Sequence, residues 1–194
     1  MSAKEENEIT IKVTCSNEEL LKCLNNKGFY EDRKFTLDDY YLIPQNLDIN
    51  NLTTREILAQ AVIIRYIVSD GKIYQKITFK KKNINENGEI ISQQAINCEI
   101  SDFKAAINLF NELGYHEIMN IKESDIVYCN NKIELALKFV ENDNTLIEIE
   151  TNNNFNTIEK LKELINQIEI PMEKDNYFVK KAENKLNKIL KRQI

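Results

Sequence analysis

Charged residues alternate with apolar residues in several short segments that could bind a phosphorylated ligand. Glu8 and Lys12 frame isoleucines in EITIK, Glu148 and Glu150 do so in LIEIE, and Arg65 ends the apolar run AVIIR. Lys and Arg bind phosphate oxygens directly, and neighbouring carboxylates can hold a bridging divalent cation. If these segments converge, the chemistry would be metal-assisted binding of a polyanion.

Strand geometry decides which of these charges share a face, because successive side chains of a strand point to opposite sides. Glu8, Thr10 and Lys12 oppose Ile9 and Ile11. The same alternation groups Ile63 with Arg65, Lys76 with Thr78 and Lys80, Glu134 with Ala136 and Lys138, and Glu148 with Glu150. Two structures satisfy this pattern: a sheet whose charged face meets water, or a closed sheet whose charged faces line a wet interior.

The alternation and the turn signals predict a β-rich chain with a few helices. Predicted strands cover residues 8–13, 34–43, 61–68, 72–81, 92–100, 117–124, 126–129, 133–141 and 145–150. Ser16 and Glu19 form a capping box for a helix that ends at Gly28, and a second helix covers 102–113. A helical turn is expected near 54–58, Asn87-Gly88 marks a turn, and two closing helices occupy 157–168 and 177–190, around Pro171.

The chain repeats its own order of elements. A strand, a helix opened by a serine and a glycine stop occur over 8–29 and again over 95–115. Neither half could close a core alone, so we expect one domain over 1–194 with pseudo-repeats at about 8–93 and 94–150, followed by C-terminal helices over 157–192. The predicted fold class is α+β.

Composition excludes several classes of protein. The 194 residues carry a net charge of −5, which argues against a general nucleic-acid binder. The absence of an 18-residue apolar run, together with the polar start MSAKEENE, predicts neither a membrane span nor a signal peptide and hence a cytoplasmic protein.

Cysteine and histidine usage restricts the metal chemistry. Cys15, Cys23, Cys98 and Cys129 form no close pair, so free thiols are expected. His116 is the single histidine, which argues against a histidine-based metal site or a Ser-His-Asp triad. Any divalent cation would have to bind carboxylates, which favours Mg²⁺ or Mn²⁺ over zinc.

The segment Glu8–Lys12 resembles the ExExK signature of CYTH domains, the triphosphate tunnel metalloenzymes. That superfamily includes class IV adenylate cyclases, thiamine triphosphatases and inorganic triphosphatases. Further matches follow in the family's order: Asp38-Asp39-Tyr40-Tyr41, AVIIR, ITFK, CEISD, Leu113-Gly114-Tyr115, Ile121-Lys122, LIEIE and Asn176-Tyr177. The resemblance covers residues 8 to 179.

This resemblance implies a closed, antiparallel, eight-stranded β-barrel that forms a tunnel, with flanking helices. It implies metal-dependent phosphoryl chemistry on ATP, thiamine triphosphate or tripolyphosphate, in which water or a ribose hydroxyl attacks in line. Class IV cyclases further imply a homodimer. The implied phosphate-binding residues are Lys12, Arg65, Lys80 and Lys122, and the implied ligands of Mg²⁺ or Mn²⁺ are Glu8, Glu148 and Glu150.

Several positions depart from the family pattern. They are Thr10 for a glutamate, Ile63 for an arginine, Ala95 and Asn97 for acidic residues, Ser124 for an arginine, and Lys138 for an aspartate. Three hypotheses therefore stay open: a cyclase or triphosphatase, a degenerate tunnel that binds a phosphate-bearing ligand or a partner without catalysis, and a scaffold filled with salt bridges around Lys138. The sequence assigns no catalytic residue.

Overall fold

The computed structural model describes residues 8–84, 90–173 and 176–191, and in them the chain forms eight strands and five helices. The strands are β1 (Glu8–Lys12), β2 (Tyr30–Pro44), β3 (Val62–Ser69), β4 (Lys72–Ile84), β5 (Ile90–Glu99), β6 (Tyr115–Cys129), β7 (Glu134–Val140) and β8 (Thr145–Glu150). The helices are α1 (Asn17–Asn26), α2 (Thr54–Ala59), α3 (Phe103–Glu112), α4 (Ile158–Ile168) and α5 (Lys181–Ile189).

The eight strands form one sheet in the order β1-β8-β7-β6-β2-β3-β4-β5. This confirms the predicted α+β class and the eight antiparallel strands that the resemblance implies, whereas the sequence pattern predicts nine strand segments. In the described residues, β1 and β5 are the ends of this order and no strand pairing joins them. The sheet is therefore not closed by hydrogen bonds, and the predicted closed barrel is not confirmed.

The second edge of β1 is bonded to a later segment of the chain. The amide of Thr10 donates to the carbonyl of Tyr177 over 2.9 Å, and Val179 donates back to Thr10 over 3.0 Å. The amide of Glu173 donates to the carbonyl of Lys12 over 2.9 Å. Because β8 pairs with the opposite edge, β1 has partners on both sides without any contribution from β5.

The chain divides into two compact units, and each is described by itself. Among the described residues, unit 1 contains Leu37–Lys122 and the segment from Lys181 onward, whereas unit 2 contains the chain up to Thr36 and Glu123–Lys180. The long strands β2 and β6 each contribute to both units. Each unit combines segments of both predicted repeats, and the repeat itself stays a prediction.

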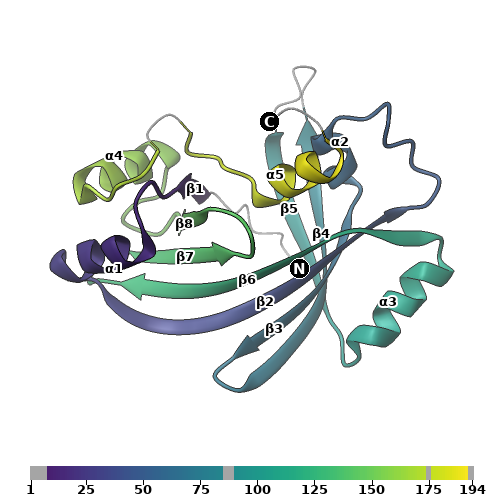
Figure 1. Cartoon of the computed structure of the whole chain (residues 1–194), viewed down its shortest axis with the longest axis horizontal. Helices are drawn as coiled ribbons and strands as arrows, with labels where there is room; N and C mark the ends of the chain where they lie inside the picture. Colours follow the sequence, from purple (N-terminus) through teal and green to yellow (C-terminus); the bar gives the residue numbers. More distant parts are fainter. Residues whose placement is uncertain (1–7, 85–89, 174–175, 192–194) are drawn as a thin grey trace. The chain divides into compact units, whose positions relative to one another are not determined.

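In unit 2, α1 and α4 lie beside the short strands β1, β8 and β7 (Figure 1). Ser16 and Glu19 form the predicted capping box at the start of α1, and Gly28 follows the helix with a φ of 76°. The apolar face of the strands packs on these helices. Its fully buried residues include Ile9, Ile11, Leu20, Leu24, Leu135, Leu137, Ile147, Leu161 and Ile165. The charged side chains of the same strands are thus directed to the opposite face.

In unit 1, α3 packs on one face of the sheet (Figure 1). The ring of Phe103 in α3 meets Tyr40 of β2 edge-on, with 5.2 Å between centroids. β3 and β4 form a hairpin, as the turn-type sequence Ser69-Asp70-Gly71 between the two predicted strands indicates. It turns through Asp70 and Gly71, whose φ values of 50° and 71° suit the two-residue hairpin turn that right-twisted strands prefer.

The structure corrects several predicted boundaries. β2 begins at Tyr30 and not at residue 34. Its first residues are mostly charged and are exposed on both faces, so the sequence shows no alternation there that would predict a strand. β6 is one strand rather than the two predicted. α5 begins only at Lys181, because residues 177–179 are extended along β1. The predicted Asn87-Gly88 turn lies outside the described residues.

No helix among those described has both the length and the apolar composition needed to span a bilayer.

Candidate functional site

Three carboxylates meet on the polar face of unit 2. Glu8 in β1 and Glu150 in β8 are cross-strand partners, and Glu148 precedes Glu150 on the same face. One carboxylate oxygen from each lies within 4.8 Å of the others. The alternation of β1 and β8 explains this grouping, because Ile9, Ile147 and Ile149 are buried on the other face. The structure thus brings together the three predicted metal ligands.

The chemistry of this donor set fits a hard divalent cation. All three donors are carboxylate oxygens, which Mg²⁺ and Mn²⁺ prefer, and neither histidine nor cysteine belongs to the cluster. Three like charges at this separation repel one another unless a cation offsets them. The ammonium of Lys180 contributes weakly, at 4.0 Å from Glu8 Oε1. A bound divalent cation would complete this compensation.

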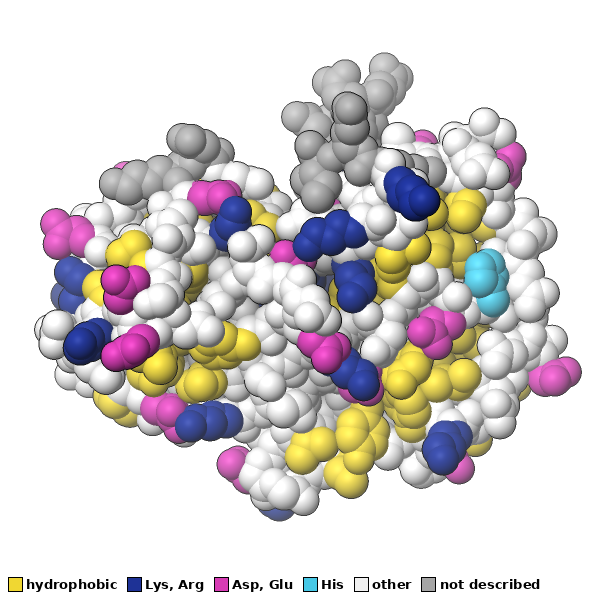
Figure 2. All heavy atoms as spheres, viewed as in Figure 1, with side chains coloured by type: hydrophobic (Ala, Val, Ile, Leu, Met, Phe, Trp, Pro, Cys, Tyr) yellow, Lys and Arg dark blue, Asp and Glu magenta, His cyan; other side chains and the backbone are white. Residues whose placement is uncertain are grey.

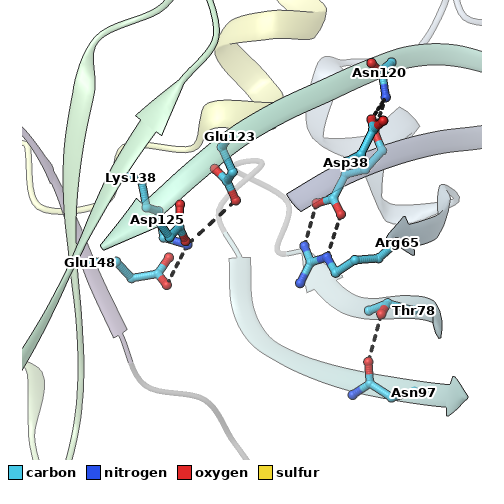
Figure 3. Close-up of polar contacts among 10 residues, drawn as sticks. Asp38, Arg65, Thr78, Asn97, Asn120, Glu123, Asp125, Lys138 and Glu148 are labelled. Carbon is cyan, nitrogen blue, oxygen red and sulfur yellow. Dashed lines mark hydrogen bonds and ion pairs between the residues drawn. The ribbon is translucent and has the colours of Figure 1, made fainter. Parts of the chain in front are cut away.

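A lysine lies against the same cluster. Lys138 Nζ in β7 lies 3.0 Å from Glu148 Oε1, 3.3 Å from Asp125 Oδ2 and 4.0 Å from Glu123 Oε1. Figure 3 shows these three carboxylates directed at the Lys138 ammonium. The side chains of Asp125 and Glu123 are each 1% exposed, and that of Lys138 is 12% exposed. Glu148 therefore belongs both to the carboxylate cluster and to an ion-pair group around Lys138.

The surroundings of Lys138 keep it charged. Burial alone would lower the pKa of Lys138, because it disfavours the charged form. The charges of Glu148, Asp125 and Glu123 outweigh that effect, and the net result is a raised pKa. Lys138 therefore acts as a permanent cation at physiological pH.

In unit 1 a buried carboxylate, that of Asp39, is surrounded by cations. Arg65 in β3 donates from Nε to Oδ1 and from Nη2 to Oδ2 of Asp39, both over 2.6 Å. Burial would raise the pKa of Asp39, but Arg65, with smaller contributions from Lys181 and Lys80, lowers it overall. Asp39 is consequently an ionised, buried carboxylate among cations. Of the predicted phosphate-binding residues, Arg65 thus bonds to Asp39 directly and Lys80 acts on it electrostatically.

The other two predicted phosphate-binding residues have different local surroundings. Lys12, in unit 2, pairs with Glu173 at 2.8 Å and is about one-third exposed. Lys122 is exposed on β6. The pKa of Tyr40 is raised, mainly by burial, and the charge of nearby Lys122 opposes that shift. Tyr40, on which the charge of Lys122 acts, packs on Phe103 of α3.

The residues that depart from the family pattern are accommodated locally. Thr78 donates a hydrogen bond from its hydroxyl to the Asn97 side chain over 2.8 Å (Figure 3). Ile63 and Thr10 are buried, and Ser124 is exposed. Ile63 and Thr10 are therefore packing residues, and Asn97 is a neutral hydrogen-bonding partner.

Sequence reasoning missed Glu123 and Asp125. The predicted strands end at residue 124 and start again at residue 126, so the sequence pattern does not show that Glu123 and Asp125 lie on the same face. In the single strand β6, Ile121, Glu123, Asp125 and Val127 alternate with more exposed residues and share one buried side. The alternation itself was the signal, because an uninterrupted strand would have aligned both carboxylates.

On the face shown in Figure 2, acidic and basic side chains are interspersed among the coloured atoms.

Comparison with known proteins places these features in context. The CYTH domain model matches residues 6–187. A search of curated proteins found no match. Among solved structures, a protein from Pyrococcus horikoshii OT3 superposes with a TM-score of 0.68 at 22% identity, covering 94% of this chain and 99% of that one.

Two further structures are similar in fold. A candidate adenylyl cyclase from Hippeastrum, described as having a dominant triphosphatase activity, has a TM-score of 0.62 at 13% identity, covering 97% of both chains. A candidate adenylate cyclase from Vibrio parahaemolyticus has a TM-score of 0.60 at 12% identity, covering 98% of this chain and 99% of that one. The family match extends over nearly the whole length, and the chain therefore belongs to the CYTH domain family.

Proposed function

We propose that this chain carries out metal-dependent phosphoryl chemistry on a small triphosphate, as a class IV adenylate cyclase-like enzyme or a triphosphatase. The observation that carries the proposal is the convergence of Glu8, Glu148 and Glu150, with oxygens within 4.8 Å of one another. Family membership supports it, because the chain matches the CYTH domain over residues 6–187. Unit 1, taken by itself, has a group of cations around Asp39, and we propose Arg65 and Lys80 of this group as phosphate ligands.

The proposed roles follow from the charge of each residue. A divalent cation on Glu8, Glu148 and Glu150 would neutralise negative charge on phosphate oxygens. Arg65 offers planar N–H donors that suit phosphate, and Lys80 adds a compact positive charge. Part of the Arg65 donor set is used by Asp39. Asp39 thereby fixes the guanidinium in one orientation before a phosphate binds.

Turnover assays test the proposal. Purified protein is incubated with ATP, thiamine triphosphate or tripolyphosphate, with Mg²⁺, with Mn²⁺ or with EDTA, and cyclic nucleotide and released phosphate are both measured. We expect turnover of at least one substrate that requires the metal. The variant Glu148→Gln should abolish it, whereas Glu163→Gln, at an exposed position of α4, should match the wild type. Well-folded protein without turnover of any of the three would contradict the enzyme proposal.

A second candidate function is binding without catalysis. The observation that favours it is that Lys138 already pairs with Glu148 and Arg65 already pairs with Asp39. Calorimetry with tripolyphosphate in EDTA distinguishes the candidates. Binding that is equally tight with and without Mn²⁺, in a protein without turnover, would favour the binder, and metal-dependent turnover would exclude it.

A further inference from the structure

Glu148 is shared by two charge groups of unit 2. It lies with Glu8 and Glu150 in the carboxylate cluster, and its Oε1 lies 3.0 Å from Lys138 Nζ. A charge-assisted hydrogen bond of this length occupies one lone-pair direction of the carboxylate. Anything that binds the cluster through Glu148 therefore meets the ammonium as a competitor.

The sheet fixes the position of Lys138. On one side it is the cross-strand partner of Asp125 in β6, and on the other it pairs with Leu146 in β8. Glu148 is the partner of Ala136, so it lies diagonally next to Lys138 on the same face. Diagonal neighbours in a sheet lie within reach of long side chains. Strand register thus sets the contact. The side chains of Lys138 and Glu148 are only 12% and 22% exposed, so the contact does not depend on a mobile surface rotamer.

We propose that Lys138 is a tethered cation that competes with a divalent metal ion for Glu148 and so sets the metal affinity of the Glu8–Glu148–Glu150 cluster. The inference rests on the proposed metal site. Two effects act in the same direction: the ammonium holds Glu148 by a hydrogen bond, and its positive charge repels a divalent cation at short range in a partly buried environment. Glu123 and Asp125 hold the ammonium in place, which maintains the competition.

The test compares Mn²⁺ binding to the wild type and to Lys138→Met, a variant that keeps an unbranched apolar stem and removes the charge. Isothermal calorimetry with MnCl₂ alone should show affinity at least about tenfold higher in the variant, because both the hydrogen bond and the repulsion are lost. Lys138→Arg keeps the charge and should stay close to the wild type. Lys132→Met makes the same charge change at an exposed turn and should also leave the affinity unchanged.

Thermal unfolding gives a second measurement that is independent of activity. Without Lys138, Glu123 and Asp125 repel each other and Glu148, so Lys138→Met should melt at a lower temperature in EDTA and regain stability in Mn²⁺ more than the wild type does. If this variant folds only with metal, the double variant Lys138→Met with Asp125→Asn reduces the repulsion. It should still bind Mn²⁺ more tightly than the wild type.

The outcomes separate the two proposals. Equal or weaker Mn²⁺ affinity in Lys138→Met, with clear binding by the wild type, overturns the tethered cation and leaves the metal site standing. Binding by Lys138→Met alone supports the tethered cation and removes the metal from the function proposed for the wild type. Binding by neither protein overturns both.

Discussion

Unit 1 and unit 2 carry opposite electrostatic arrangements on their polar faces. In unit 1, the buried Asp39 carboxylate lies among cations: Arg65 bonds to it directly, and Lys80 and Lys181 act on it at longer range. In unit 2, the buried Lys138 ammonium lies among carboxylates. Each group therefore consists of one ion surrounded by ions of the opposite sign. We call the central ion, Asp39 or Lys138, the minority ion and the surrounding ions the majority ions.

This difference indicates what each group can bind. Excess positive charge favours an anion such as phosphate, and excess negative charge favours a metal cation. The minority ion has a structural task in both cases, because like charges gathered on a partly buried sheet face repel one another. Removing it should affect stability and ligand binding together, whereas removing a majority ion should affect mainly the ligand of its own unit.

The largest expected effect is on the minority ion of unit 1. Asp39→Asn leaves the Arg65 group without its buried counter-ion, and we expect a loss of about 3 kcal/mol in the free energy of unfolding. Urea denaturation measures this loss. Asp38→Asn is the matched control, because its amide oxygen can still accept from Asn120. Tripolyphosphate should restore stability to Asp39→Asn more than to the wild type, and failure of that recovery would contradict an anion site in unit 1.

The pH dependence of stability gives a second test of the same ion. The folded-state pKa of Asp39 is lowered, so its ionised form stabilises the folded chain. This contribution is complete above the unfolded-state pKa of about 3.9 and is lost as the pH falls through the lower folded-state pKa. Stability of the wild type minus that of Asp39→Asn should therefore be constant above about pH 4 and should shrink below it. A difference that does not change in acid would show that Asp39 is not ionised when folded.

A smaller effect is expected when the guanidinium of Arg65 is replaced by an ammonium, which changes the shape of the cation and not its charge. Arg65→Lys keeps the charge but loses the planar donor set, so the affinity for tripolyphosphate in EDTA should fall by about tenfold. The affinity for Mn²⁺ alone, which we assign to unit 2, should not change. Arg33→Lys, in an exposed ion pair of unit 2, serves as control. Equal losses for both ligands would contradict the division of labour between the units.

The smallest effects concern the helix caps, one in each unit. Ser16 caps α1 in unit 2 and Thr53 caps α2 in unit 1, both in capping boxes. Changing either residue to Ala should cost about 1 kcal/mol, and Thr53→Ser should cost little. Because β2 and β6 contribute to both units, we expect both variants to lower the midpoint of one common transition in calorimetry. Two separate transitions would show that the units unfold independently.

Local chemistry explains which parts of the fold were predictable. The cap at Ser16, the Asp70-Gly71 turn and the alternation of LIEIE depend on neighbouring residues, so sequence alone indicates them. Long-range pairing does not leave such a signal. The sequence predicts a helix from residue 177, but residues 177–179 are extended along β1. The hydrogen bonds that hold them there go to Thr10, far away in the sequence, and local periodicity does not reveal such a partner.

The candidate site was predictable to a similar degree. Glu8, Glu148 and Glu150 were predicted as a set, and the structure groups them. The resemblance also indicates Arg65 and Lys80, and it includes Asp39 in the match Asp38-Asp39-Tyr40-Tyr41. It does not indicate that Asp39 orients Arg65, because that contact joins β2 and β3 and depends on the strand arrangement. Lys138 stood out as a charge reversal. Its partners in β6 were hidden by the wrong strand break, so the ion-pair group became visible only with the strand register.

Because both edges of β1 are hydrogen-bonded to later parts of the chain, the order of synthesis matters for this strand. β1 pairs with β8 on one edge and with Glu173, Tyr177 and Val179 on the other, and all of these partners are translated long after it. At about 5–20 residues per second, the ribosome reaches β8 roughly 7–30 s after it completes β1. During that interval the backbone groups of EITIK can pair with other strands. Nascent β1 therefore stays without its native partners for most of the synthesis of the chain.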